Sequence, residues 1–238
     1  MAERSLRLLS RLPRPVFPAR ERRALLARAD SIVAITRYEA SLVRALIGDD
    51  ARVCVIPNGV DLVTPAEQPP VDVVGAVLLL GGVSERKRQA GVIEALDGVA
   101  RVVVAGGWSG GEDALRNFER VVAKAGATWL GEVRDPSAVA ALQRDALALA
   151  LMSRAEVQSL AVLEALAAGT PVLLSDIPSH RELAAAFPGS VYLISELSDL
   201  AAAVAAIRSA GQPPRPVLPS WRVVAVQLVA VYRSVVAT

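Results

Sequence analysis

The sequence predicts an α/β protein with a doubly wound parallel sheet, preceded by a short N-terminal α/β segment. From residue 71 to about residue 210, short apolar runs alternate regularly with stretches of helical periodicity. The runs are nearly uninterrupted, as in strands that are covered on both faces. Regular β-α alternation also implies right-handed crossovers, and hence helices on both faces of one sheet.

The N-terminal segment repeats a simpler pattern of helix and strand. It closes at Pro57-Asn58-Gly59, whose Asn-Gly pair is a strong turn signal. The elements expected here are a helix at 21–29, a strand at 31–35, a helix at 37–47, a strand at 52–56 and a Pro-containing linker at 63–70.

The main domain is expected to contain six strands. Ligands of such sheets bind beyond the carboxyl ends of the strands, so the loops that follow the strands are the places to search for a site. Strands are expected at 76–80, 101–105, 127–130, 146–152, 172–175 and 190–194, and helices at 86–96, 112–125, 136–144, in a stretch ending at Gly169, at 179–186 and at 197–209.

The C-terminal segment begins with a second Pro-rich linker at 211–219. Ser220 suits the N-cap of a last helix, because its hydroxyl can accept from an unpaired backbone N–H. Apolar side chains then recur at helical spacing, at Trp221, Val224, Leu228, Val231 and Val235.

Composition excludes several classes of protein. The longest apolar runs are too short for a membrane-spanning helix, and a formal net charge of +2 argues against a nucleic-acid binder. One cysteine, Cys54, allows no intrachain disulfide, which fits the cytoplasm, and with a single histidine it cannot form a zinc cluster. That histidine, His180, is expected at the surface near a helix start.

The basic charge is concentrated in residues 4–28, where arginines far outnumber acids. Two interpretations stay open. The segment is either a solvated face, which is the usual role of a charge run and the one we favour, or a peripheral contact with anionic lipid at the inner membrane face.

The loop after the first main strand reads GGVSERKRQAG, from Gly81 to Gly91. Glycines let a backbone approach a ligand closely, and basic residues at a helix start favour an anion. Arg86, Lys87 and Arg88 are therefore candidates for a phosphate site, although solvated basic side chains are the alternative. The loop is neither a P-loop nor a dinucleotide fingerprint, which argues against a nicotinamide-dependent oxidoreductase.

The loop after the fourth main strand carries Glu156, and Glu164 follows in the body of the next helix. With Glu156 off the helix, both carboxylates can reach one cleft at different depths. Carboxylate oxygens suit the hydroxyl donors of a sugar.

Five segments, in order, resemble the C-terminal half of family 4 (group 1) glycosyltransferases. They are VIPNGVD at 55–61, LLLGGVSERKRQAGVIEAL at 78–96, Gly131 to Val133, SRAEVQSLAVLEALAAGTPVLLSDIPSHRE at 153–182, which holds the family's E-x7-E motif, and SWRVVAVQLVAVY at 220–232. The resemblance implies a GT-B fold and a retaining enzyme that uses a nucleotide-diphosphate sugar as donor, without a cofactor. Its metal independence agrees with the lack of a D-x-D triplet.

The resemblance also implies site roles. Glu156 would bind sugar hydroxyls, Glu164 the ribose, and Lys87 the diphosphate. The backbone N–H groups of Gln158, Ser159 and Leu160 would hold the distal phosphate. Gly81, Gly82 and Val133 complete the expected donor site, with Arg86 and Arg88 as further phosphate candidates.

The chain also departs from the family. Gly82 stands where the family has an arginine, and Val157-Gln158-Ser159 replaces its "gfG". The expected organisation is a remnant of the acceptor domain and a linker at 1–62, a nucleotide-sugar-binding Rossmann-like domain at 63–218, and a C-terminal helix at 219–238. Two hypotheses follow. The first is a glycosyltransferase that needs a partner chain with an acceptor domain, or is a truncated gene product. The second is a non-catalytic nucleotide-sugar-binding or interaction module.

Overall fold

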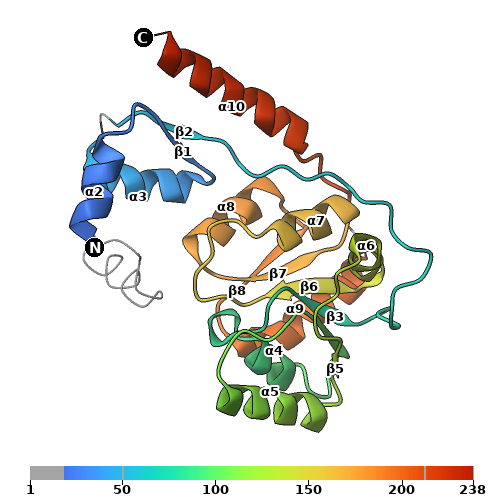
Figure 1. Ribbon diagram of the computed structural model, residues 1–238. Coiled ribbons are helices and arrows are strands. Elements are labelled where there is room, and N and C mark those ends of the chain that lie inside the picture. The colour runs from blue at the N-terminus through green and yellow to red at the C-terminus, as the bar shows by residue number, and fades with distance from the viewer. Residues whose placement is uncertain (1–18, 50, 212, 238) are drawn as a thin grey trace.

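The computed structural model of the chain describes residues 19–49, 51–211 and 213–237 (Figure 1). The first part of the basic segment, 4–18, lies outside the described residues. The N-terminal unit is a β-α-β piece, in which two parallel strands flank one helix and a further helix precedes them. Its elements are α2 (Ala19–Ala27), β1 (Ile32–Ala34), α3 (Arg37–Ile47) and β2 (Val53–Val55).

The main sheet has six parallel strands in the order β5-β4-β3-β6-β7-β8. Numbered along the domain, this is 3-2-1-4-5-6, the order of a doubly wound sheet, and it confirms the predicted fold class. The chain reverses direction across the sheet between β3 and β6. The strands are β3 (Val77–Leu80), β4 (Val102–Ala105), β5 (Thr128–Trp129), β6 (Ala148–Leu151), β7 (Val172–Ser175) and β8 (Val191–Ile194).

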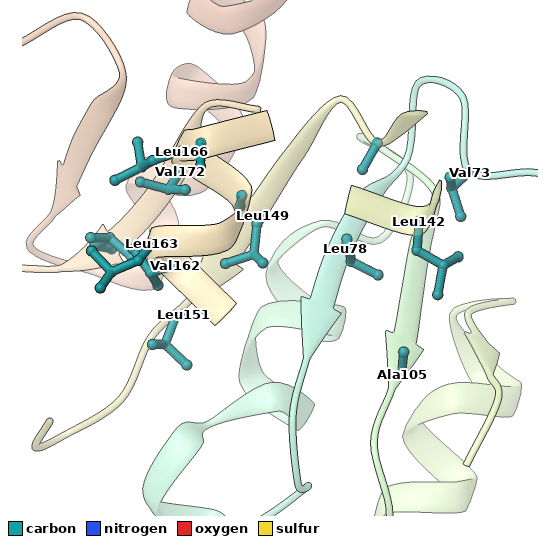
Figure 2. Close-up of a cluster of buried hydrophobic side chains, with 14 of the residues drawn as sticks. Val73, Leu78, Ala105, Leu142, Leu149, Leu151, Val162, Leu163, Leu166 and Val172 are labelled. Carbon is teal, nitrogen blue, oxygen red and sulfur yellow. The ribbon is translucent and has the colours of Figure 1, made fainter. Parts of the chain in front are cut away.

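Helices cover both faces of this sheet, and each face has its own apolar core. On one face α6, α7 and α8 enclose the cluster drawn in Figure 2, with Leu142, Leu166 and Leu183 from the three helices. On the other face α4, α5 and α9 contribute Ile93, Phe118 and Val204. The helices are α4 (Gln89–Ala95), α5 (Glu112–Lys124), α6 (Pro136–Asp145), α7 (Leu160–Ala168), α8 (Pro178–Ala186) and α9 (Leu200–Ala210), the last preceded by the 3-10 turn η2 (Leu197–Asp199).

The first helix of the main domain differs from its prediction. Residues 86–96 were expected as one helix, but a 3-10 turn, η1 (Glu85–Lys87), precedes a shorter α4. Arg88 separates them with a left-handed backbone, φ 58°. The buried Gln89 side chain bonds to Ser84 N and Gly82 O, at 3.2 and 3.1 Å, and so holds the loop away from a continuous helix.

The junction between the two units lies at the predicted turn. Val60 N donates to Pro219 O at 2.8 Å, and Trp221 N donates to Asp61 Oδ1 at 3.2 Å. A Cβ at Gly59 would lie 2.6 Å from Trp221 N, so only glycine fits against the start of α10 (Trp221–Val236). Ser220 caps α10 by accepting from Val223 N, as predicted. Within the described residues, none of the helices combines the length and hydropathy needed to cross a bilayer.

Candidate donor-binding site

The candidate site forms where two strand ends meet at the point of chain reversal. The loop after β3 carries Gly81, Gly82 and the basic residues, and the loop after β6 carries Ser153 to Ser159. Because β3 and β6 are parallel neighbours, both loops emerge at the same carboxyl edge of the sheet. This is where ligands of doubly wound sheets bind.

Lys87 is brought back against the end of its own strand. A Cβ built on Gly81 would lie 2.7 Å from Lys87 Nζ, and Gly81 itself has φ 108°, which favours glycine. Lys87 is half-buried, and its Nζ forms no hydrogen bond or ion pair with another described residue. Burial lowers the pKa of Lys87 below its ordinary value, partly offset by the nearby Glu156 carboxylate, while Arg86 lowers it further.

Glu156 is held by two donors on one of its two oxygens. Arg86 Nη1 lies 2.7 Å from Oε1, and Ser153 Oγ donates to the same oxygen at 2.9 Å. The Glu156 side chain is only 16% exposed. Its Oε2 accepts nothing from another described residue, so this oxygen is available to a ligand.

Arg86 fastens the two loops to each other. Besides Glu156, its Nη1 donates to Ala155 O at 2.5 Å, and its backbone carbonyl accepts from Arg154 N at 2.9 Å. The loop after β3 and the loop after β6 are therefore joined through one arginine.

The helix α7 begins beside the three backbone N–H groups that were expected to hold a phosphate. Leu160 is its first residue, and the N-cap Ser159 makes no side-chain cap bond. The backbone N–H groups of Gln158, Ser159 and Leu160 find no acceptor among the described residues, so they can meet an anion. The Gln158 side chain instead accepts from Asn58 N at 2.7 Å and ties the site to the junction.

Glu164 lies in the body of α7, as expected, and faces a different space from Glu156. It lines a cavity of about 620 Å³ between the junction segment, α6 and α7, and accepts from Gln143 Nε2 at 3.3 Å. No hydrogen bond or ion pair joins Glu164 to Glu156 or Lys87 in the described chain. The other cavity-lining residues are Val60 to Pro65, Arg134, Pro136, Val139, Ala140, Gln143, Arg144, Ala168 and Arg215.

The remaining predicted site residues take varied positions. Gly82 is exposed, its φ is not positive, and an added Cβ would approach only Gly107 O, at 3.7 Å. Arg88 is the N-cap of α4, as predicted for a helix start, whereas Arg86 and Lys87 lie in the preceding turn η1. Val133 lies between β5 and α6 and packs against the apolar core on the face of the sheet that α6, α7 and α8 cover.

His180 is where the sequence prediction was wrong. It was expected at the surface, but it is 1% exposed, because α8 packs its first turn onto the carboxyl edge of the sheet. Its Nδ1 lies 2.9 Å from the Ser175 carbonyl oxygen, and its Nε2 has no partner. Burial lowers the pKa of His180, against opposing effects of the Ser175 bond and Glu156.

Sequence reasoning also missed three buried serines beside Glu156. Ser153, Ser175 and Ser179 come from the ends of β6 and β7 and from α8, and each hydroxyl bonds within this edge of the sheet. For Ser153 and Ser175, a place at or just after a strand end was the only available signal. Among the described residues, no group of three or more His, Cys, Asp or Glu side chains is arranged to hold a metal ion.

Comparison with known sequences identifies two segments. The profile described as Glycosyl transferases group 1 matches residues 74–211, more than half of the chain. The profile described as Glycosyltransferase Family 4 matches residues 3–64. No curated protein matches the sequence at a significant level.

Solved structures with the same fold include several glycosyltransferases. A sucrose-phosphate synthase from Thermosynechococcus elongatus is 20% identical with a TM-score of 0.73, over 92% of this chain and 61% of its own. AviGT4, a glycosyltransferase of avilamycin A biosynthesis, is 26% identical with a TM-score of 0.60, over 86% and 63%. A GtfA/B complex is 14% identical with a TM-score of 0.60, over 79% and 40%. The chain thus spans less than two thirds of each of these relatives.

Proposed function

The chain belongs to the glycosyl transferases group 1 family, and on this premise we propose that it binds a nucleotide-diphosphate sugar at the carboxyl edge of its main sheet. In this proposal it is the donor half of a retaining glycosyltransferase.

The observation that carries the proposal is the unpaired, half-buried ammonium of Lys87 at the point of chain reversal. A cation removed from water costs free energy unless an anion pairs with it. A diphosphate would supply that anion. The open N–H groups at the start of α7 would hold its distal phosphate, since helix N-termini favour negative charge.

Arg86 fits a second phosphate role that depends on the ligand. Without ligand it pairs with Glu156 at 2.7 Å. Arg86 already lies close enough to Lys87 to influence its pKa. Movement of the guanidinium from Glu156 to a diphosphate would compensate for the family arginine that Gly82 replaces, and would leave Glu156 open to the sugar.

The two glutamates serve different parts of the donor in this proposal. Oε2 of Glu156, with Oε1 held in place, would accept from sugar hydroxyls beside the diphosphate. Glu164 would accept from the ribose, with the nucleoside in the 620 Å³ cavity that it lines. Val133, which the resemblance places in the donor site, precedes Arg134, a lining residue of that cavity.

The reaction would break the bond between the anomeric carbon and a diphosphate oxygen. The electron pair leaves with the diphosphate, whose charge rises as the sugar becomes oxocarbenium-like. Lys87, Arg86 and the α7 N–H groups would stabilise that growing charge in place, which is the main form of electrostatic catalysis. An acceptor oxygen then bonds to the anomeric carbon on the face that the diphosphate left, and its proton leaves with the departing diphosphate.

A partner chain is one proposed source of an acceptor domain. The GtfA/B structure is a complex, which gives a precedent for transferase chains that assemble. The predicted peripheral contact of the basic N-terminal segment with the inner membrane face stays a prediction, as does a cytoplasmic location.

A second candidate function is a non-catalytic nucleotide-sugar-binding or interaction module. The observation that favours it is the departure at Gly82, together with an Arg86 that engages the sugar-binding carboxylate. The nucleotide-sugar-binding form of the module would share the donor site with the glycosyltransferase and differ from it in turnover.

Calorimetry with UDP-, GDP- and ADP-sugars tests the donor site directly. We expect binding to a member of one nucleotide class, and no binding to any would contradict both the glycosyltransferase and the nucleotide-sugar-binding form of the module. Turnover of the bound donor, measured with the chain alone and with the products of neighbouring genes, separates enzyme from module.

A further inference from the structure

A buried cluster of one histidine and three serines lies beneath the Glu156 loop. Its members are nearly inaccessible: Ser153 is 0% exposed, Ser175 6%, Ser179 2% and His180 1%. They come from three neighbouring segments, the ends of β6 and β7 and the first turn of α8. The glycosyl transfer chemistry proposed above uses none of them.

Two of the hydroxyls hold the backbone of the loop at both ends. Ser175 Oγ donates to Ser153 O at 2.6 Å, and Ser179 Oγ donates to Glu156 O at 2.8 Å. The segment from residue 153 to 156 has no regular secondary structure, so these bonds from the β7–α8 side fix it in place. Buried hydrogen bonds of this kind are costly to leave unmade.

The third hydroxyl orients the carboxylate itself. Ser153 Oγ donates to Glu156 Oε1 at 2.9 Å, so the same residue that is held through its carbonyl also directs the side chain of Glu156. If Arg86 leaves Glu156 for a diphosphate, Ser153 remains as the protein donor on Oε1. The carboxylate then keeps its orientation with Oε2 toward the ligand.

His180 fixes the far side of the cluster. A carbonyl oxygen only accepts, so the 2.9 Å contact with Ser175 O requires the proton of the neutral imidazole on Nδ1. Nε2 is then unprotonated, and it has no hydrogen-bond partner among the described residues. Ser175 Oγ lies 3.3 Å from the same Nδ1 and gives its own proton to Ser153 O. The imidazole thus anchors the residue whose hydroxyl holds the Glu156 loop.

We infer that Ser153, Ser175, Ser179 and His180 are positioning residues that hold the Glu156 carboxylate for the donor sugar. This inference rests on the proposed function, since it assigns a purpose to the cluster only if Glu156 binds sugar. The cluster acts through Glu156 and touches neither the nucleoside nor the diphosphate.

Two substitutions test the inference by splitting the affinity. In Ser153→Ala and Ser175→Ala, affinity for the nucleotide sugar should fall about threefold to tenfold, the effect of one lost hydrogen bond, while affinity for the matching nucleoside diphosphate is unchanged. Ser190→Ala is the matched control, because Ser190 is 4% exposed but lies before β8, at the amino edge of the sheet. It should change neither affinity.

A ligand-free measurement tests the geometry separately. His180 is the only histidine in the sequence, so nitrogen-15 histidine NMR gives one imidazole signal. At pH 7 it should show Nδ1 protonated and Nε2 unprotonated, and Ser175→Ala should shift both nitrogens. A proton on Nε2 would overturn the inference, whatever the ligand does.

The outcomes distinguish this inference from the function on which it rests. Wild-type binding with equal losses for nucleotide sugar and nucleoside diphosphate in the serine variants would overturn the inference alone, as would lower stability with an unchanged affinity ratio. Failure of the wild-type chain to bind any nucleotide sugar would overturn the proposed function and the inference together.

Discussion

Arg86 Nη1 lies 2.7 Å from Oε1 of Glu156, and this ion pair joins the loops after β3 and β6 across the point of chain reversal. Both partners are partly shielded, with side chains 40% and 16% exposed. Lys87, beside them, has no such partner in the described chain. Arg86, Lys87 and Glu156 together carry two positive charges and one negative charge, and this excess of positive charge suits a diphosphate.

The ion pair predicts opposite effects of one substitution on two ligands. Glu156→Gln releases Arg86 and removes a negative charge beside the diphosphate position. Affinity for a nucleoside diphosphate should therefore rise about threefold, while affinity for the nucleotide sugar falls. Arg86→Met should lower the affinity for both ligands, because the diphosphate loses the guanidinium as a binding partner. Calorimetry measures both affinities. An unchanged diphosphate affinity in Arg86→Met would show that Arg86 only pairs with Glu156 and does not bind the diphosphate.

Two adjacent glycines predict contrasting results. Gly82 has room for a side chain, so Gly82→Arg should restore a diphosphate contact and tighten nucleoside diphosphate binding about fivefold, or ~1 kcal/mol. Gly81→Ala should weaken binding, because the new Cβ would lie 2.7 Å from Lys87 Nζ on a backbone with φ 108°. Titration of both variants with the same diphosphate checks this, and equal effects of the two would refute the geometry.

Lys87 predicts a pH dependence of binding. Burial lowers its pKa in the free protein, and a bound diphosphate would raise it again. From pH 7 upward, affinity should therefore be constant at first and then fall as pH rises through the lowered pKa of free Lys87, below the ordinary 10.5. Lys87→Arg stays charged and should remove this fall. Calorimetry at successive pH values above 7 measures it; a wild-type profile as flat as that of Lys87→Arg would argue against Lys87 as the phosphate ligand.

His180 predicts a pH dependence of stability. Because burial lowers its folded pKa, the unfolded chain takes up a proton first as pH falls below 6.5. As pH falls from 6.5 to the folded pKa of His180, the free energy of unfolding should drop by up to ~1.4 kcal/mol per pH unit. Above pH 6.5 this contribution of His180 to stability should be complete. Asn can replace the Nδ1–H donor without titrating, so His180→Asn should flatten this part of the curve. Urea unfolding at pH 7.5, 6.5 and 5.5 compares the two, and parallel curves would contradict the buried neutral state.

The sheet could be predicted because its four inner strands, β4, β3, β6 and β7, are buried on both faces. Continuous apolar runs such as 77–80 and 172–175, set between helical patterns, are typical of buried parallel strands, and Gly81 marked where the first strand ends. The same reasoning placed Glu156 in a loop and Glu164 in a helix. These features depend on short stretches of neighbouring residues, so they could be predicted from the sequence alone.

Features that depend on tertiary contacts could not be predicted. The break at Arg88 follows from Gln89 bonding back to Gly82 and Ser84, and nothing in the ERKR letters indicates a left-handed residue there. His180 sits in a polar stretch, so its burial becomes visible only when α8 is packed on the sheet. The pairing of Arg86 with Glu156 joins residues 70 positions apart.

We propose above all that this edge of the sheet is a donor site, in which Glu156 binds the sugar and Glu164 binds the nucleoside. The most direct test is calorimetry of one nucleotide sugar and its nucleoside diphosphate with wild type, Glu156→Ala and Glu164→Ala. Glu156→Ala should lower the ratio of nucleotide-sugar to diphosphate affinity at least tenfold, about 1.4 kcal/mol, while Glu164→Ala weakens both ligands by the same factor. An unchanged ratio in Glu156→Ala, or no binding by the wild-type chain, would contradict the claim.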